Sequence, residues 1–258
     1  MQTRLQVGGE TLSVDYYDKG SGKVLLFLHG WGAPYSVYAG LLESLSSFCR
    51  VIAPCFPGFG GTTEPKTAYD VTAYADFVRA FMKQLDIPLS SVMGHSHGGR
   101  VTLELLSDPT EGLKFDKAVL MDSAGLPAKL TAKKRIRVRV FKICKSFALL
   151  PPMKKLFPNA VDALQKKFGS ADYASVSPIL RESMVKVLHA DMTDALPKIT
   201  VPTLLLWGDR DDATPLWMGQ TMEKHIPDAG LVVIDGGGHF CYTADIGKTV
   251  AVLKSFLA

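Results

Sequence analysis

The segment GHSHG at residues 94–98 constrains this chain more than any other. It follows the apolar pair 92–93 and reads G-x-S-x-G, a pattern typical of a tight turn between a strand and a helix that leaves the hydroxyl of Ser96 exposed. The two flanking glycines are expected because a Cβ at Gly94 or Gly98 would collide with neighbouring backbone. The pattern also occurs by chance, so its meaning depends on the rest of the chain.

Short apolar runs alternate with helix-like patterns along most of the chain, which indicates a parallel sheet covered by helices on both faces. The expected strands are 24–28, 51–53, 91–94, 118–121, 203–207 and 231–234, after an N-terminal hairpin over 5–7 and 12–17. The expected helices are 37–47, 71–85, 99–106, 216–225 and 247–257. On such a sheet, functional side chains are expected beyond the carboxyl ends of the strands.

The alternation stops between residues 126 and 200, a helix-like stretch interrupted by several prolines. This stretch is too long for a structureless loop inside a compact domain. The chain has 258 residues, 47% of them hydrophobic, which is enough for one large domain with an insertion. We therefore expect a core over residues 1–125 and 201–258, with a helical cap (lid) inserted over residues 126–200.

The C-terminal half offers the partners that a serine nucleophile needs. A serine hydroxyl reacts poorly at neutral pH unless a base, usually a histidine held by a carboxylate, takes its proton. Asp211 and His239 each follow an apolar strand. The chain order Ser96, Asp211, His239 matches one known order of these three roles. Asp122, just past another strand, is the alternative acid.

The sequence resembles α/β-hydrolase-fold proteins that carry an inserted cap. The resemblance rests on five motifs: HGWG at 29–32, PGFGGT at 57–62, GHSHGG at 94–99, WGDRDDATP at 207–215 and GGGHF at 236–240. As a set they are specific for the fold, and they say little about the substrate.

The resemblance implies a role for each matching residue. Ser96 would be the nucleophile, His239 the general base and Asp211 the acid. The backbone N–H groups of Trp31 and His97 would form the oxyanion hole, which is expected to stabilise the charge that develops on the substrate.

Other residues in these motifs are expected to support the site rather than react. His29, next to Gly30, should shape the oxyanion loop through a hydrogen bond, and the side chains of His95 and His97 should pack or cap. Relatives often carry an acidic residue where this chain has Cys55. That departure changes a loop beside the pocket but not the triad.

The expected activity is that of a serine hydrolase that cleaves a carboxylic ester or related acyl compound through an acyl-enzyme, with no metal or organic cofactor. The same triad in relatives also cleaves C–C bonds, amides or thioesters, or transfers acyl groups, and the fold does not separate these reactions. Apolar cap residues that could line a lid favour a small-molecule substrate with an apolar group. They are Phe141, Phe147, Leu149, Leu150, Met153 and Phe157.

A formal net charge of +4 hides a strongly basic cap segment. Residues 129–167 contain twelve Lys or Arg and one acid, a net charge of about +11. Within it, four apolar residues and three basic residues fall on separate faces of a predicted helix, and the apolar face is expected to pack on the core. The apolar residues are Ile136, Val140, Ile143 and Phe147, and the basic ones are Arg135, Arg139 and Lys142.

Three interpretations of the basic segment remain. It is a solvated cap surface, a site for acidic substrates, or a surface that contacts anionic lipid in a low-turnover binding or membrane-surface protein. A nucleic-acid partner is not expected, because no aromatic residues interleave with the charges and no nucleic-acid motif is present. No feature of the sequence fixes an oligomeric state.

The cysteines and the N-terminus favour a cytoplasmic protein. The four cysteines, Cys49, Cys55, Cys144 and Cys241, form no C-x-x-C pair and no metal-ligand spacing, so free thiols are expected. The chain begins with a strand-like pattern rather than an apolar signal region, and it has no apolar run long enough to span a membrane.

Overall fold

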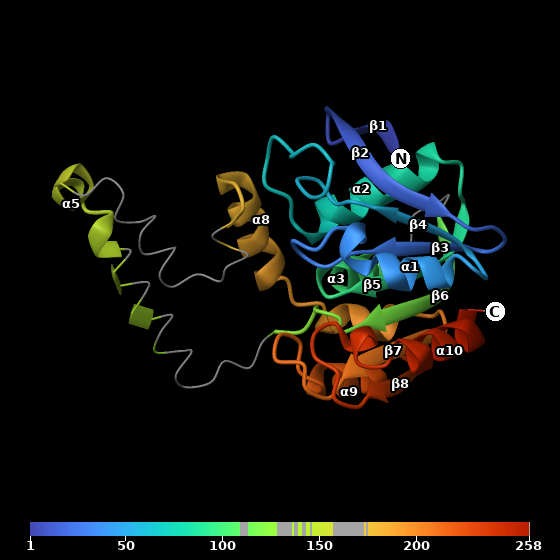
Figure 1. Ribbon diagram of the computed structural model, residues 1–258. Helices are drawn as coiled ribbons and strands as arrows, with labels where there is room; N and C mark the ends of the chain where they lie inside the picture. Colours follow the sequence, from blue (N-terminus) through green and yellow to red (C-terminus); the bar gives the residue numbers. More distant parts are fainter. Residues whose placement is uncertain are drawn as a thin grey trace.

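The computed structural model describes residues 1–108, 113–127, 146–156 and 175–257, together with residues 136, 139, 140, 143, 144 and 173. It shows an eight-stranded sheet in the order β1-β2-β4-β3-β5-β6-β7-β8 (Figure 1). Strand β2 is antiparallel to β1 and β4, and all the other pairs are parallel. The expected α/β architecture is confirmed.

Every expected strand lies within an observed one. The strands are β1 Gln2–Val7, β2 Glu10–Lys19, β3 Val24–Leu28, β4 Arg50–Pro54, β5 Leu89–His95, β6 Lys114–Met121, β7 Thr203–Gly208 and β8 Ala229–Ile234. The first two form the expected hairpin, whose turn residues Gly8 and Gly9 have φ values of +58° and +77°. Positive φ at both turn positions suits the right-handed twist of a hairpin, and glycine adopts it without strain.

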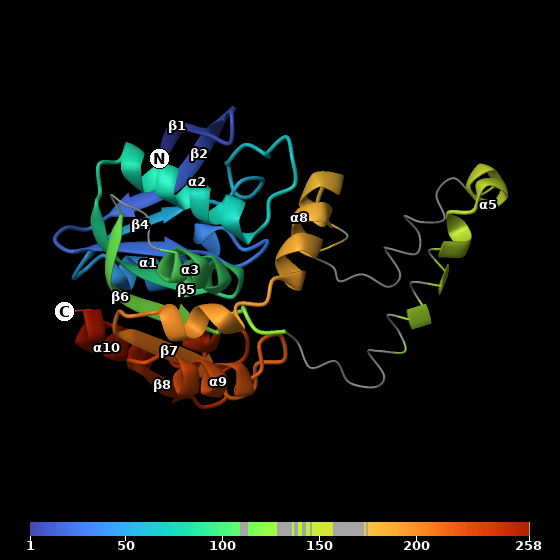
Figure 2. The same cartoon turned by 180° about the vertical axis from the view of Figure 1, so that it is seen from behind.

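Helices cover both faces of the sheet (Figures 1 and 2). Helices α1 (Ala39–Leu45) and α10 (Ile246–Leu257) pack on one face, and α2 (Val71–Gln84), α3 (His97–Ser107) and α9 (Trp217–His225) pack on the other. Each buries an apolar stripe that repeats every three to four residues, the spacing of one helix face. The carboxylate of Asp70 caps α2 by accepting a 2.9 Å hydrogen bond from the Ala73 N–H.

Within residues 126–200 the structure describes three helical elements: α5 (Pro151–Leu156), α8 (Pro178–His189) and the 3-10 helix η2 (Thr193–Lys198). Helix α8 lies against the core, where Leu180, Met184 and Val187 are buried. Its Ser183 hydroxyl accepts a 2.9 Å hydrogen bond from the Tyr69 N–H. Helix α5 stands away from the sheet in both views (Figures 1 and 2).

The prediction that the apolar face of the basic segment packs on the core is wrong. Ile136, Val140, Ile143 and Phe147 are 42–65% exposed. The described core surface is instead covered by α8, whose Leu180 and Val187 belong to the apolar cluster of the core. Apolar spacing identifies a face but not its partner.

The 3-10 helix η2, which falls inside the predicted cap, packs with the core instead. Leu196 and Ile199 are fully buried and belong to the same apolar cluster as α3 and α9. Among the described residues, no helix is both long and apolar enough to cross a bilayer. The four cysteines are free thiols as expected, with Cys49, Cys55 and Cys241 buried.

Candidate functional site

Ser96 occupies a sharp turn between the end of β5 and the start of α3. Its backbone has φ +51° and ψ −113°, a strained conformation for a residue with a side chain. A Cβ built at Gly98 would lie 2.0 Å from the Leu28 carbonyl oxygen, and one at Gly94 would lie 2.5 Å from the Gly98 carbonyl oxygen. The expected need for both glycines is confirmed.

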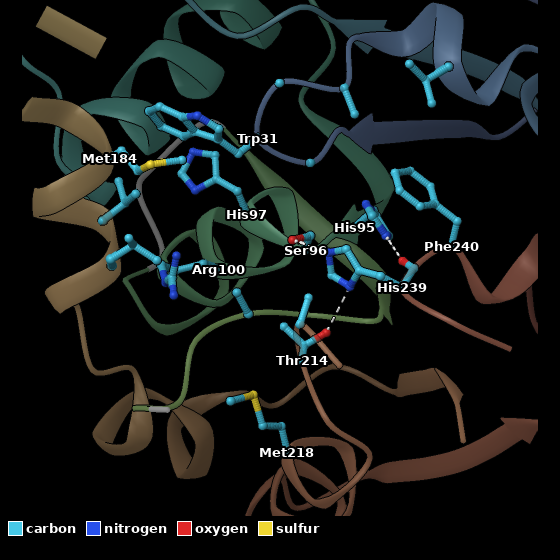
Figure 3. Close-up of a pocket in the computed structure, with 18 of the residues that line it drawn as sticks. Trp31, His95, Ser96, His97, Arg100, Met184, Thr214, Met218, His239 and Phe240 are labelled. Carbon is cyan, nitrogen blue, oxygen red and sulfur yellow. Dashed lines mark hydrogen bonds between the residues drawn. The ribbon is translucent and has the colours of Figure 1, made fainter. Parts of the chain in front are cut away.

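The structure brings Ser96, His239 and Asp211 into one hydrogen-bonded chain. His239 Nε2 lies 2.9 Å from Ser96 Oγ (Figure 3). On the other side of the ring, His239 Nδ1 lies 2.9 Å from Asp211 Oδ2. An ionised carboxylate only accepts hydrogen bonds, so Nδ1 carries the proton and Nε2 is left to accept from the serine hydroxyl. This is the tautomer in which a histidine can remove a serine proton.

Asp211 is held as a buried anion. Burial raises its pKa, but hydrogen bonds from His239 and Thr214 outweigh that effect and leave the pKa below its ordinary value. Its Oδ1 accepts from the N–H groups of Ala213 at 2.7 Å and Thr214 at 2.9 Å, and the Thr214 hydroxyl donates to Oδ2 at 2.7 Å. These donors fix the plane of the carboxylate against His239.

Asp122, the alternative acid, does not contact His239. Its two carboxylate oxygens accept 2.9 Å hydrogen bonds from the N–H groups of Gly208 and Cys241, which tie the end of β7 to the loop after His239. The side chain is fully buried, and burial raises its pKa to about 6. Asp122 therefore joins two loops behind the site, and Asp211 is the carboxylate that reaches the histidine.

The two amides expected to form the oxyanion hole lie at the same pocket. His97 is the first residue of α3, where a backbone N–H has no acceptor within its own helix. The Trp31 N–H donates to no other described residue. Both residues line the cavity that contains Ser96.

The ring of His29, predicted to support the oxyanion loop, bridges two backbone groups. Its Nε2 accepts a 2.8 Å hydrogen bond from the Phe56 N–H, so the proton must be on Nδ1, which donates to the Gly30 carbonyl at 2.7 Å. Burial lowers the pKa of His29 to about 4, which keeps the ring neutral in this bridging role.

A second relay, which sequence reasoning missed, joins the oxyanion loop to His239. The Gly30 N–H donates to the Tyr38 hydroxyl at 3.1 Å, and that hydroxyl donates to His95 Nδ1 at 2.7 Å. His95 Nε2–H then donates to the His239 carbonyl at 2.6 Å. Burial lowers the pKa of His95 to about 3, so the ring is neutral. No local sequence signal marks Tyr38, because it reaches His95 only through the fold.

The cavity around Ser96 has a volume of about 590 Å³, and both polar and apolar side chains line it. The apolar lining residues include Leu126, Met184, Val187, Leu188, Met218 and Phe240. Three of these come from α8, and none is among the six apolar residues expected to line a lid. Of those six, Phe141 and Phe157 lie outside the described residues, Phe147, Leu149 and Leu150 are exposed, and Met153 is half-buried.

Comparisons with known proteins point to one family. Residues 25–251 match the family described as "Alpha/beta hydrolase family". The chain is 27% identical over 246 residues to a pimeloyl-[acyl-carrier protein] methyl ester esterase of Neisseria meningitidis, with 91% of this chain and 93% of that protein covered. It is 25% identical over 251 residues to the AB hydrolase superfamily protein YisY of Bacillus subtilis, with 93% of each covered.

Solved structures agree on the fold. An esterase from Exiguobacterium antarcticum superposes with a TM-score of 0.76 at 23% identity, and a bromoperoxidase from Bacillus anthracis with a TM-score of 0.77 at 20% identity. Each comparison covers 100% of this chain and 99% of the other. Because the family match spans most of the sheet and all three members of the hydrogen-bonded chain, this protein belongs to the alpha/beta hydrolase family.

Proposed function

We propose that this protein is a serine hydrolase that cleaves a carboxylic ester, with Ser96 as nucleophile, His239 as general base and Asp211 as the orienting acid. The observation that carries the proposal is the unbroken chain of two 2.9 Å hydrogen bonds from Ser96 Oγ through His239 to Asp211. Among the relatives reported above, two are described as esterases, which favours an ester over other acyl bonds.

The reaction follows from the positions of these groups. Ser96 Oγ attacks the substrate carbonyl as its proton passes to His239 Nε2, and the oxyanion is held by the N–H groups of Trp31 and His97. The protonated His239 then gives its proton to the leaving alcohol as the acyl–oxygen bond breaks and the acyl-enzyme remains. Water then attacks this ester as its proton passes to His239 Nε2. His239 returns that proton to Ser96 Oγ as the acyl–oxygen bond breaks, which releases the acid and restores the enzyme.

Selectivity is proposed to come from α8, which we place in a cap over residues 126–200. Its side chains Met184, Val187 and Leu188 line the cavity and would contact an apolar part of the substrate. The alternatives that share the triad are amide, thioester and C–C hydrolysis and acyl transfer. Parallel assays on matched ester, amide, thioester and vinylogous 1,5-diketone substrates separate them.

The first test of the proposal is covalent labelling. Intact mass after incubation with a fluorophosphonate should show one adduct on the wild type and none on Ser96→Ala. Thr214→Ser, which keeps a hydroxyl beside the same histidine, is the control and should still label. Absence of an adduct on the folded wild type would overturn the assignment of Ser96 as an activated nucleophile.

A second candidate function is binding to an anionic membrane surface through residues 129–167. It is favoured by four apolar side chains exposed at helical spacing, Ile136, Val140, Ile143 and Phe147, in a segment with a net charge of about +11. Basic helices with an exposed apolar face bind anionic lipid by combining the two interactions.

This second function is tested with vesicles of phosphatidylglycerol and phosphatidylcholine. The triple variant Arg135→Glu, Arg139→Glu and Lys142→Glu should lose most of its binding to phosphatidylglycerol vesicles. A control triple variant with the same charge change on exposed core lysines, Lys23→Glu, Lys83→Glu and Lys114→Glu, should bind better than the cap variant. Equal binding by the two variants would contradict a role for the cap.

A further inference from the structure

Arg100 is a buried cation at the candidate site, and no described residue forms an ion pair or a hydrogen bond with its side chain. It lies one turn after Ser96 on α3, is only 5% exposed and lines the cavity that contains Ser96 and His239. Its Nε is enclosed without a hydrogen-bond acceptor, and no ion pair to its guanidinium is present among the described residues. Burial lowers its pKa to about 10, which still leaves it charged at neutral pH.

An unpaired buried cation is unfavourable, because the charge has lost water and gained no opposite charge in return. None of the described residues that line the cavity is an Asp or Glu. Arginine is also the side chain best suited to bind a carboxylate through two parallel hydrogen bonds. The missing partner of Arg100 is therefore expected to arrive with a ligand.

Two neighbours of Arg100 are also without partners. The indole Nε1 of Trp31 and both ring nitrogens of His97 are buried and make no hydrogen bond to the described residues. Burial, with the charge of Arg100 adding to it, lowers the pKa of His97 well below its ordinary value, so its neutral ring offers one N–H donor. We call Trp31, His97 and Arg100 the unpaired wall; it carries donors and one positive charge but no acid.

The unpaired wall and His239 lie on opposite sides of Ser96 (Figure 3). In the proposed reaction His239 must protonate the leaving alcohol, so the alcohol lies on the His239 side of the serine. The acyl chain then extends the other way, toward Arg100. Ser96 directly precedes α3 and Arg100 lies in its first turn, so their backbones are separated by about 6 Å along the helix axis.

We propose that Arg100 binds a carboxylate on the acyl chain of the substrate, so that the substrate class is the monoester of a dicarboxylic acid. This inference rests on the proposed ester hydrolysis for the direction of the acyl chain. The apolar lining from Leu126, Met184 and Val187 would contact the methylene groups between the two carboxyl carbons.

The test compares two aryl esters that differ only in charge at the far end of the acyl chain. They are mono-(4-nitrophenyl) adipate and its methyl-capped diester, with nitrophenol release measured against enzyme-free blanks. The wild type should favour the free acid by about 10- to 100-fold in kcat/KM, the range expected for a hydrogen-bonded charge. A third substrate, 4-acetoxybenzoate, carries its carboxylate on the leaving group and should gain no such preference over its methyl ester.

Variants assign the preference to Arg100. Arg100→Met should bring the free-acid to diester ratio to about 1 or below, and Arg100→Lys should retain part of it. Arg4→Met, the same substitution on the exposed part of β1, should keep the wild-type ratio. Arg100→Met should also melt at or above the wild-type temperature, because it removes an unpaired buried charge. A wild type that shows no preference for the free acid, or a preference that survives in Arg100→Met, would overturn the assignment.

A binding measurement separates failure of this inference from failure of the proposed function. Adipate should raise the melting temperature of the wild type and of Ser96→Ala, but not that of Arg100→Met. If fluorophosphonate labels Ser96 while adipate has no effect and the two esters react equally, the carboxylate subsite is wrong and the hydrolase stands. If nothing labels or hydrolyses while adipate still binds through Arg100, the subsite stands and the hydrolase is wrong.

Discussion

The two sides of the cavity differ in whether their polar side chains make hydrogen bonds to the protein. On the side of His239, which we call the paired wall (His95, Ser96, Thr214 and His239), each side chain makes at least one hydrogen bond to the protein. On the unpaired wall, the side-chain nitrogens of Trp31 and His97 and the Nε of Arg100 are buried and make no hydrogen bond to the described residues.

This difference separates groups arranged for chemistry from groups that await a ligand. Hydrogen bonds to protein hold a side chain in one geometry before substrate arrives, which is what proton transfer and charge stabilisation require. A buried polar group without a partner costs free energy that a matching ligand can recover. In our two proposals the paired wall carries out the reaction, and the unpaired wall selects the substrate.

The largest expected effect tests the paired wall. Asp211→Asn should lower kcat/KM by about 10⁴-fold, because an amide beside Nδ1 favours the wrong histidine tautomer. Asp122→Asn makes the same chemical change at a buried carboxylate that does not touch His239, and its loss should be at least tenfold smaller in the same steady-state assay. Equal losses would mean that the second carboxylate shares the catalytic role.

A smaller effect is expected where the paired wall meets the oxyanion loop. Tyr38→Phe leaves the Gly30 N–H and His95 Nδ1 without partners in a buried setting, so the free energy of unfolding should fall by about 2 kcal/mol. Urea denaturation measures this. The control is Tyr242→Phe, whose hydroxyl makes only a 3.3 Å bond at a partly exposed site. A loss no greater than that of the control would show that the relay adds no stability.

The next prediction is a pH dependence of the free energy of unfolding that comes from Asp122, which is buried behind the paired wall. Its folded pKa of about 6 lies above the ordinary 3.8, so the folded state binds the proton more tightly than the unfolded one. Its contribution to stability is therefore full below pH 3.8 and is lost as the pH rises through 6. Going from pH 7 to pH 5 should stabilise the wild type by about 1 kcal/mol relative to Asp122→Asn. The same pH slope in both proteins would contradict this.

The smallest effect is predicted on the unpaired wall. His97→Leu replaces a ring with two unpartnered nitrogens by an apolar side chain of similar size, so the free energy of unfolding should stay within about 1 kcal/mol of the wild type. Chemical denaturation of His97→Leu and Tyr38→Phe under the same conditions compares the two losses of stability directly. A loss as large as that of Tyr38→Phe would contradict the proposed difference between the paired and the unpaired wall.

The sheet and the hydrogen-bonded chain of Ser96, His239 and Asp211 could be predicted because their signals are local. Each core strand is a short apolar run, and Ser96, Asp211 and His239 each stand just past one. The choice between Asp211 and Asp122 could not be made with the same force, because both follow strands. Only the folded backbone shows that the amides of Gly208 and Cys241 occupy the oxygens of Asp122.

The lining of the pocket was harder to predict for a physical reason. Apolar residues at 136–147 have the spacing of a packing face, yet the pocket is covered by α8, and nothing in a spacing specifies the partner. Arg100 did carry a local signal: it lies in the first turn of the helix that begins directly after Ser96, so it must lie close to the serine. Its lack of an acidic partner is visible only in three dimensions.

The relay from Gly30 through Tyr38 and His95 to the His239 carbonyl has a mechanical consequence. In the proposed reaction, the base and the oxyanion donors act on the same tetrahedral intermediate. Catalytic groups must be held to within about 0.5 Å of their working positions. The relay crosses between their two loops with three short, buried links. We therefore expect that a displacement of one loop also moves the other. The distance between His239 and the proposed oxyanion hole would then stay the same when the two loops move together.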